Sequence, residues 1–501
     1  MTDEQRIIAN RIFLIMAFIS MLVFSPLLTG GVYYIDDFHR LYSGNVSYWV
    51  NNGRPLAYVL LIILNQSSIV SDLSPALLII GLTALIATLS WTSIRLRVMG
   101  VSLSALTILT IIFNPFMSQV CLYVYDSLGM LLSITLIFIA TFLSTESKRK
   151  YFTCGFILFL AAICFYQTSA NYAFISLLSV LVLAAAQDKR KELTTYALGV
   201  AALLLALICY KFFIAPLTVT DLYNQTRSQL VPLNFQGLDI VVENMRKTFD
   251  IVLLAFPGYN LIPVAIIFFA GTVGCIKIAL IRLQKHTCNV ENVLLTILII
   301  SSPFLVCLGI AGFLLFLKES IFFPRVLGAF SVALIFNVII AQRAFPALTK
   351  FFAVLIVFNL LFSATSMTAT FRAVVNQNNF ESGIINSMRD SLSGLPKNKI
   401  KQISFIGKGP LSSDVGPAMH NYPLLKEILY SSFMENNDFS FYGLAKRAAV
   451  MYPLVNTTDS IKNYKPEAII DSNCIYNLYV KDNTAIFNFE QVACSRLDKF
   501  R

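Results

Sequence analysis

The sequence predicts a polytopic α-helical membrane protein with a small α/β domain at its C-terminus. Of the 501 residues, 57% are hydrophobic and only 13% are charged, which is about half the charged share of a soluble domain. The hydrophobic residues also gather into runs of about 20, the length that a helix needs to cross a bilayer. These observations exclude a soluble globular enzyme, a disordered chain and a collagen-like repeat.

About eleven hydrophobic runs are long enough to cross roughly 30 Å of hydrocarbon. We expect membrane-spanning helices at about residues 7–28, 73–94, 101–122, 126–143, 151–168, 171–187, 194–215, 261–282, 292–316, 321–341 and 349–368.

The net charge is +11, and the positions of the basic residues are explained by the predicted spans rather than by a nucleic-acid-binding surface. With a cytoplasmic N-terminus, every short basic cluster falls on one side of the membrane, whereas the opposite side receives isolated cations only. This is the positive-inside pattern. It predicts a C-terminus on the outer side and no nucleic-acid partner. The cytoplasmic cations are Arg6, Arg11, Arg95, Arg97, Lys148, Arg149, Lys150, Lys189, Arg190, Lys191, Lys277, Arg282, Lys285, Arg343 and Lys350.

Two long loops fall on the outer side. The first, 29–72, contains YYIDDFHRLYSG and WVNNGRPL, followed at 55–65 by an apolar run that is too short to span. We expect this run to form a helix at the membrane surface. The second loop, 216–260, contains the amphipathic stretch LDIVVENMRKTFDIVLLAF.

The chain becomes polar after the last apolar run, so we expect a membrane domain over 1–368 and an outer α/β domain over 369–501. KQISFIG has the pattern of a strand, and CIYNLYV and AIFNF, which flank KDNT, have the pattern of a hairpin. Helices are expected at 374–391 and 419–434.

An acidic pair, Asp36 and Asp37, follows the first span, with Arg40 one helical turn later. Adjacent carboxylates repel, so one of them should have a raised pKa unless a cation offsets the repulsion. Such a carboxylate can act as a general base on an acceptor hydroxyl. The alternative is a solvated acidic loop with a local Asp–Arg pair.

Several cations lie near outer helix ends within apolar sequence, where an unpaired charge is costly. Arg54 follows Gly53 in GRPL, Lys211 lies near the end of the seventh span, and Arg325 follows Pro324. Together with Arg40, they are our candidates for binding the phosphate of a lipid-linked donor. The alternative is that they extend to bulk lipid headgroups.

Polar side chains at two outer turns are candidates for contact with a sugar. Asp126 begins the fourth span and would otherwise cap that helix. The turn FYQTSANY also offers groups that hydrogen-bond or stack, although tyrosine is common at both membrane interfaces. The residues of this turn are Tyr166, Gln167, Asn171 and Tyr172.

Cys474 and Cys494 are the only two cysteines of the predicted outer domain. They enclose the predicted hairpin, and an oxidising compartment would permit a disulfide between them. We therefore predict that they are bridged.

The sequence contains no Walker loop, HExxH or CxxC motif and no GxGxxG after a strand. Nucleotide-driven pumping, nicotinamide redox chemistry and zincin-type hydrolysis are therefore disfavoured. Energy for a reaction on the outer side would have to arrive with the substrate, for instance as a lipid-phosphate sugar. No cofactor is predicted, although Asp36 and Asp37 could together bind a divalent ion.

The order of these features resembles the GT-C class of polyprenyl-phosphate-dependent glycosyltransferases. More narrowly, YYIDDFHR followed by NNGRPL is similar to the bacterial O-antigen glucosyltransferases of the serotype-converting GtrII-like family. The likeness of motifs covers about residues 33–56, and the C-terminal domain contributes none.

This resemblance implies an undecaprenyl-phosphate glucose donor and a lipopolysaccharide O-antigen acceptor. It implies transfer with inversion on the periplasmic face of the bacterial inner membrane, with Asp36 or Asp37 as the base. Enzymes with lipid monophosphate donors generally need no metal.

Two other functions remain as alternatives. A secondary transporter or lipid-sugar flippase would show repeats and discontinuous helices at the midplane, and the sequence shows neither. An O-antigen polymerase or ligase also works from the outer side with Arg-rich loops. The acidic first loop and the large C-terminal domain favour a transferase.

Overall fold

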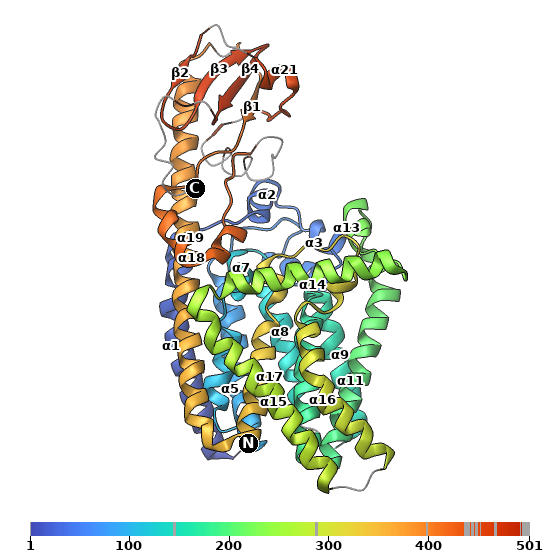
Figure 1. The fold of residues 1–501 in the computed structure, drawn as a ribbon. Coiled ribbons are helices and arrows are strands. Elements are labelled where there is room, and N and C mark those ends of the chain that lie inside the picture. The colour runs from blue at the N-terminus through green and yellow to red at the C-terminus, as the bar shows by residue number, and fades with distance from the viewer. Residues whose placement is uncertain are drawn as a thin grey trace.

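The protein is a bundle of long helices with a small sheet beyond one end, as seen in a computed structural model (Figure 1). The N-terminus lies at the opposite end of the bundle. The structure describes residues 2–143, 147–285, 289–396, 399–434, 441, 445, 449–450, 452–464, 468–490 and 492.

The long helices follow the predicted spans. Within the described residues, 8 helices are long and apolar enough to cross a membrane, which confirms the predicted fold class. The bundle helices are α1 (Asp3–Gly30), α5 (Ala76–Val98), α8 (Ser127–Phe142), α9 (Lys148–Phe165), α10 (Ser169–Ala186), α11 (Arg190–Cys209), α15 (Leu261–Lys285), α16 (Val290–Ala311), α17 (Phe330–Ala344) and α18 (Thr349–Ser393).

Three predicted spans do not form long apolar helices. Helix α8 has 16 residues, and the first turn of α9 is basic. The run 101–122 is a correction to our prediction, because it is not one helix. It consists of α6 (Ser104–Ile108), the 3₁₀ turn η1 (Leu109–Ile111) and α7 (Met117–Leu122).

The break in this run has a local cause. Pro115 has no N–H to continue a helix, and the side chain of Asn114 satisfies the backbone on both sides of the break. Its amide donates to the carbonyls of Thr110 and Ile111, and its oxygen accepts from the N–H of Met117. Irregular backbone at membrane depth is tolerated where protein shields it, and Asn114 is buried.

Helix α18 is 45 residues long and continues past residue 368, so the predicted domain boundary falls inside it. Its first half packs against α1 and α15, and its second half supports the sheet. Ile384 and Met388 of this second half lie in one buried cluster with Phe405 and Phe487 of the sheet.

The sheet has four strands in the order β1-β4-β3-β2. Strand β1 pairs parallel to β4, and the predicted hairpin β3–β4 is antiparallel. Its turn residues Asp482 and Asn483 both have positive φ, which tight hairpin turns require and Asp and Asn tolerate. The strands are β1 (Gln402–Ile406), β2 (Asp471–Ser472), β3 (Asn477–Lys481) and β4 (Thr484–Asn488).

The other C-terminal segments depart from the predicted helices. Residues 374–391 are helical as part of α18, whereas 419–434 is only partly helical. It contains the end of α19 (Gly416–Asn421) and the 3₁₀ helix η8 (Pro423–Glu427), and then continues as irregular chain. The remaining short helices of this region are η7 (Ser413–Val415) and α21 (Asp459–Lys462).

Cys474 is disulfide-bonded. Cys494, its predicted partner, lies outside the described residues, so the pairing stays a prediction.

The two long loops fold into short helices at the end of the bundle that carries the sheet. The first loop contains α2 (Asp36–Ser43), α3 (Ser47–Asn51) and α4 (Pro55–Asn65). The second continues from the π-helical segment η2 (Tyr210–Ile214) into α12 (Ala215–Thr218), α13 (Leu222–Arg227), α14 (Phe235–Ala255) and η3 (Gly258–Asn260). Three further 3₁₀ segments are η4 (Gly312–Phe316), η5 (Pro324–Leu327) and η6 (Pro346–Leu348).

Helix α14 is the amphipathic stretch of the sequence and lies across this end of the bundle (Figure 1). Its Asn244 is buried and donates to the carbonyls of Leu315 and Leu317, each at 3.1 Å. Phe235 and Phe249 remain exposed. The helix is therefore held to the bundle by this buried polar side chain and by apolar residues of its C-terminal half, of which Ile251 and Ala255 are buried in the core.

The break in 101–122 yields a test of the fold. Asn114→Ala leaves the buried carbonyls of Thr110 and Ile111 without their side-chain partner, at roughly 1–3 kcal/mol for each unsatisfied group, whereas the N–H of Met117 keeps its bond to the backbone carbonyl of residue 114. We expect a lower melting temperature in detergent. Asn260→Ala is the control, because the side chain of Asn260 donates only to the carbonyl of Pro257. Equal melting of the two variants would contradict the capping role.

Candidate functional site

The acidic pair opens helix α2, and Arg40 lies on the same face of that helix. Residues three and four positions apart are neighbours on a helix. Accordingly, Arg40 lies 3.6 Å from a carboxylate oxygen of Asp37 and 3.8 Å from one of Asp36. The pair therefore shares one cation, and this local Asp–Arg pairing is the alternative that the sequence left open, whereas Arg40 was predicted to bind the donor phosphate.

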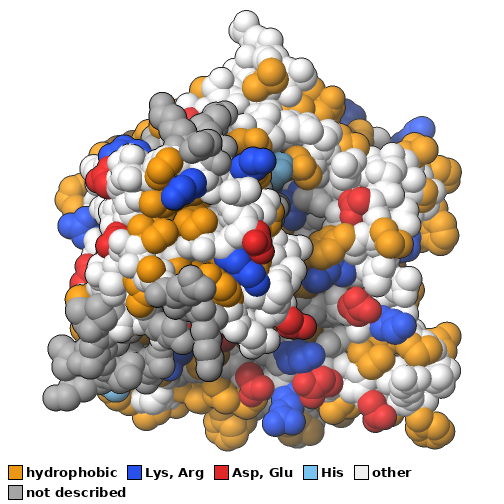
Figure 2. All heavy atoms as spheres, turned by 90° about the horizontal axis from the view of Figure 1, so that it is seen from above, with side chains coloured by type: hydrophobic (Ala, Val, Ile, Leu, Met, Phe, Trp, Pro, Cys, Tyr) orange, Lys and Arg blue, Asp and Glu red, His pale blue; other side chains and the backbone are white. Residues whose placement is uncertain are grey.

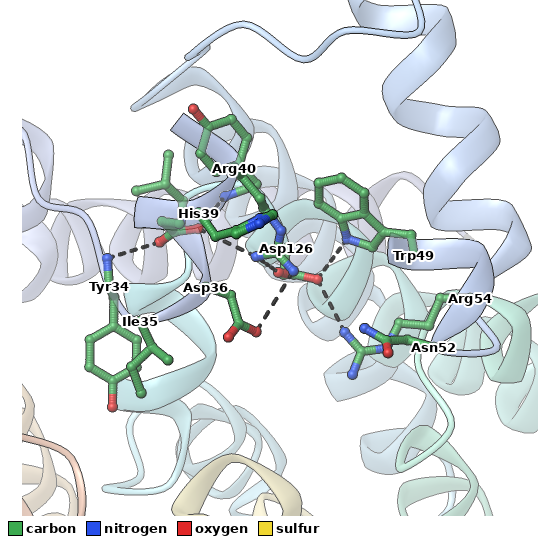
Figure 3. A network of polar contacts seen from close by, with 12 residues as sticks. Tyr34, Ile35, Asp36, His39, Arg40, Trp49, Asn52, Arg54 and Asp126 are labelled. Carbon is green, nitrogen blue, oxygen red and sulfur yellow. Dashed lines mark hydrogen bonds and ion pairs between the residues drawn. The ribbon is translucent and has the colours of Figure 1, made fainter. Parts of the chain in front are cut away.

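Asp126 joins this group from the start of α8, at the centre of the network in Figure 3. One oxygen pairs with Arg40, and the other accepts from Arg54 at 3.1 Å and from the Trp49 indole at 2.8 Å. The carboxylate is buried, but the two guanidinium groups outweigh burial and hold its pKa below the ordinary value. Both oxygens of Asp126 therefore bind protein groups.

The turn at Gly53 directs the side chain of Arg54 towards Asp126, and residues from several elements stabilise this turn. Gly53 has φ +72, a conformation that favours glycine. Its carbonyl accepts from the Tyr210 hydroxyl at 2.8 Å and from Gln167 at 3.1 Å. The guanidinium of Arg54 also stacks on the ring of Tyr166. Predicted residues from three separate segments thus meet around Asp126.

The two acidic residues have different surroundings. Asp37 is fully buried, and its carboxylate accepts from the backbone N–H groups of Tyr34 at 3.1 Å, Val124 at 2.9 Å and Tyr125 at 3.3 Å. Burial raises the pKa of Asp37 to about 7, although Arg40 and the Val124 N–H oppose this shift. Asp37 therefore ties the acidic loop to the chain before α8.

Asp36, in contrast, is accessible. Its side chain is 34% exposed, and its ion pair with Arg40 is longer than the other pairs of Arg40. In Figure 3 its carboxylate and the Arg54 guanidinium both project below the Arg40–Asp126 pair. Of the two predicted carboxylates, Asp36 is the one that a substrate can reach.

Arg325 contributes a second charge to this region from η5. Its backbone N–H donates to Gln119 at 3.0 Å, and its guanidinium lies over the ring of Tyr123 at 4.4 Å. It lies within electrostatic range of Asp36 and Asp126. In the part of the chain that the structure describes, Arg325 makes no ion pair, so no carboxylate compensates its charge by direct contact.

This end of the molecule is hollowed near its centre, and basic side chains lie within the hollow (Figure 2). Hydrophobic side chains are frequent around the rim in the same view. Basic side chains in such a hollow suit an anionic substrate.

The sequence matches the family described as Glucosyl transferase GtrII over residues 25–336, more than half of the chain. The chain belongs to this family. It is also 26% identical to an uncharacterised 55.3 kDa protein in the gtrB 5′ region of Salmonella phage P22, over 93% of this chain and 95% of the relative. No solved structure matches. Membership confirms the resemblance seen in the sequence and makes the chain a glucosyltransferase-family membrane protein.

The other predicted site residues of this GtrII-family protein lie elsewhere. Lys211 is exposed on η2 beside Phe212. Asn171 is buried and donates to the carbonyl of Ala311 at 3.0 Å, so it ties α10 to the end of α16. Tyr172 is buried against Gly328. The structure therefore does not gather these three around Asp126.

Sequence reasoning missed the residues that support the site. Trp49 donates to Asp126 and stacks on Arg40 at 4.4 Å. Gln119 is fully buried in α7 and contacts both Tyr34 and Arg325. A buried glutamine in an apolar run is costly, and this was the one signal that pointed to Gln119.

The carboxylate of Asp37 already accepts three backbone N–H groups, which constrains cation binding by the acidic pair. Among the residues that the structure covers, no group of three His, Cys, Asp or Glu side chains could hold a metal ion.

The raised pKa of Asp37 predicts a pH-dependent stability. At a pH between the ordinary pKa of 3.8 and the raised pKa of about 7, the carboxyl group of Asp37 is protonated in the folded chain and ionised in the unfolded chain. The group therefore stabilises the fold at low pH, and that contribution is lost as the pH rises towards 7. Asp37→Asn cannot titrate.

We expect the difference in melting temperature, wild type minus Asp37→Asn, to fall as the pH rises from 5 to 7 and then to level off. A difference that stays constant from pH 5 to 8 would contradict the assignment of the proton to Asp37.

Proposed function

We propose that this GtrII-family protein transfers glucose from undecaprenyl-phosphate glucose to the O-antigen of lipopolysaccharide. The reaction takes place on the periplasmic face of the bacterial inner membrane. One observation carries the proposal: the accessible carboxylate of Asp36 lies within electrostatic range of the unpaired guanidinium of Arg325. A base and an anion-binding group in the same region are what transfer from a sugar phosphate requires.

The proposed reaction is a single displacement. Asp36 takes the proton of an acceptor hydroxyl, whose oxygen attacks the anomeric carbon of the donor sugar. The bond from that carbon to the phosphate oxygen breaks, and the phosphate leaves with the electron pair. Attack from the face opposite the leaving group inverts the configuration.

Arg325 serves the leaving group. Negative charge grows on the phosphate as the sugar departs, and a fixed cation stabilises that charge most in the transition state. The planar guanidinium fork can grip two phosphate oxygens at once. The Arg40–Asp126–Arg54 network is internally paired and holds α2 and the turn at Gly53 around the substrate.

The direction of the helices supports the proposed orientation. Arg95 and Arg97 end helix α5, and the cluster Lys148–Lys150 begins α9. Because the helices alternate in direction, these clusters fall at the end opposite the sheet, where Figure 1 shows the N-terminus. By the positive-inside rule this end is cytoplasmic, so Asp36 and Arg325 face the periplasm.

A flippase remains the competing function. A flippase is expected to contain a discontinuous helix, and residues 101–122 form one. In transporters, however, such helices line a substrate cavity. Here Asn114 and Phe116 are buried, and the backbone groups at the break form hydrogen bonds with the side chain of Asn114. We therefore favour transfer over transport.

The role of Asp36 is tested by paired isosteric variants. We expect Asp36→Asn to lose about 10²-fold or more in transfer rate per folded molecule, the scale of a missing general base. Asp37→Asn is the matched control and should keep its rate per folded molecule, because Asp37 does not reach substrate. The assay is transfer from purified lipid-phosphate glucose to O-antigen. Near-normal transfer by Asp36→Asn would overturn its catalytic role.

Arg325 is tested in the same assay. Arg325→Ala should lose roughly 10²-fold, the scale of a removed transition-state donor, and Arg325→Lys should keep partial activity because it retains the charge without the fork. Arg246→Ala, which removes an exposed cation of α14, should be neutral. An unchanged rate for Arg325→Ala at both low and saturating donor would remove Arg325 from the site.

A further inference from the structure

The C-terminal domain reaches back to the acidic loop through one irregular segment, residues 428–433, which we call the strap. The hydroxyl of Tyr34 donates to the carbonyl of Ile428 at 2.7 Å, and the N–H of Ile35 donates to the hydroxyl of Tyr430 at 2.6 Å. The rings of Tyr34 and Tyr430 also meet edge to face at 5.7 Å. Segments nearly 400 residues apart thus meet immediately before Asp36.

The backbone at this meeting point is strained. Ile35 has φ 41 and ψ −98, a conformation that a β-branched residue rarely adopts. Such strain costs of order 1–3 kcal/mol and persists only where the surroundings hold it, often at functional sites. Here the strap binds Ile35 on its N–H. Because Ile35 directly precedes α2, its conformation sets the direction in which Asp36 leaves the chain.

The same contacts extend to Arg325. The hydroxyl of Tyr34 also accepts from the side chain of Gln119 at 3.0 Å, and the oxygen of Gln119 accepts the backbone N–H of Arg325 at 3.0 Å. A continuous chain of hydrogen bonds therefore runs from the strap carbonyl of Ile428 through Tyr34 and Gln119 to Arg325. The strap is therefore linked to the proposed base through Ile35, which directly precedes Asp36, and to the proposed phosphate-binding group through Tyr34 and Gln119.

The strap is anchored on the extension of α18. The buried carboxylate of Glu381 accepts from the N–H of Ser432 at 2.8 Å, from the Ser432 hydroxyl, and from Gln377 at 2.8 Å. A buried carboxylate without hydrogen bonds would be very costly, so this position fixes the strap firmly. Because α18 extends beyond the bundle, Glu381, which anchors the strap, lies close to the acidic loop.

A second contact joins the domain to helix α2 independently of the strap. Phe38, in the first turn of α2, lies in the hydrophobic core of the C-terminal domain with Ile384 and Phe405. In addition, Asn378 of α18 accepts the N–H of Tyr33 at 3.3 Å. The acidic loop is therefore packed between the membrane bundle and the C-terminal domain.

We propose that the C-terminal domain is a positioning element of the transferase, in which the strap holds Asp36 and Arg325 in register and Tyr430 is its positioning residue. The inference rests on the proposed function. Catalytic groups lose much of their effect when displaced, and a shift of 1 Å can cost about 10²-fold in rate. The domain thus serves the chemical step even though its own residues do not reach the reacting atoms.

The test separates positioning from folding. Tyr430→Phe keeps the ring contact with Tyr34 but removes the hydroxyl that binds Ile35. We expect kcat per folded molecule to fall about 10-fold, with the donor KM unchanged, because the link from Tyr34 to Arg325 remains. Tyr422→Phe is the control, since it keeps the ring contact of Tyr422 with Phe362 and should match wild type.

A second variant tests the chain of hydrogen bonds that runs from the strap through Tyr34 to Arg325. Tyr34→Phe breaks the chain of hydrogen bonds to Gln119, so it should lower kcat and also raise the donor KM. A kcat per folded molecule equal to wild type in both tyrosine variants would overturn the inference, as would a loss confined to the amount of folded protein.

Asp36→Asn separates this inference from the proposed function. In that background, Tyr430→Phe should cause no further loss, because the group it positions is absent. An active Asp36→Asn would refute the assignment of the base. An inactive Asp36→Asn beside a fully active Tyr430→Phe would refute the positioning role alone.

Discussion

The site depends on the buried ion pair between Arg40 and Asp126. A buried charge is tolerated only when it is compensated and hydrogen-bonded, and removal of one partner costs several kcal/mol. Asp126 meets this condition by binding Arg40, Arg54 and the indole of Trp49. These partners come from α2, from the turn before α4 and from α3, so compensation of one carboxylate assembles three segments of the first loop against the bundle.

Two neighbouring carboxylates differ because their surroundings differ. Asp37 is enclosed and accepts three backbone N–H groups, whereas Asp36, one position earlier on the helix, stays accessible. The environment sets the role of a carboxylate in many enzymes. In this protein, Asp37 fastens the loop that presents Asp36.

Helix α18 joins the two parts of the molecule mechanically. It starts among the bundle helices and ends under the sheet, without an intervening linker. Glu381 and Asn378 in its second half bind the strap and the acidic loop. A flexible linker would allow the C-terminal domain to move independently, whereas a continuous helix fixes its distance from the bundle. The C-terminal domain is accordingly held next to the acidic loop.

The sequence by itself determined the features that depend on local pattern. Runs of about 20 apolar residues, period-two alternation at the hairpin and basic clusters at one end predicted the fold class, and the acidic pair beside Arg40 marked one part of the polar network. It did not determine that Asp126 would be enclosed by arginines, that Lys211 would face outwards, or that Tyr430 would hold Ile35. Those outcomes depend on contacts between segments up to 395 residues apart, and local periodicity contains no information about which distant segments pack together.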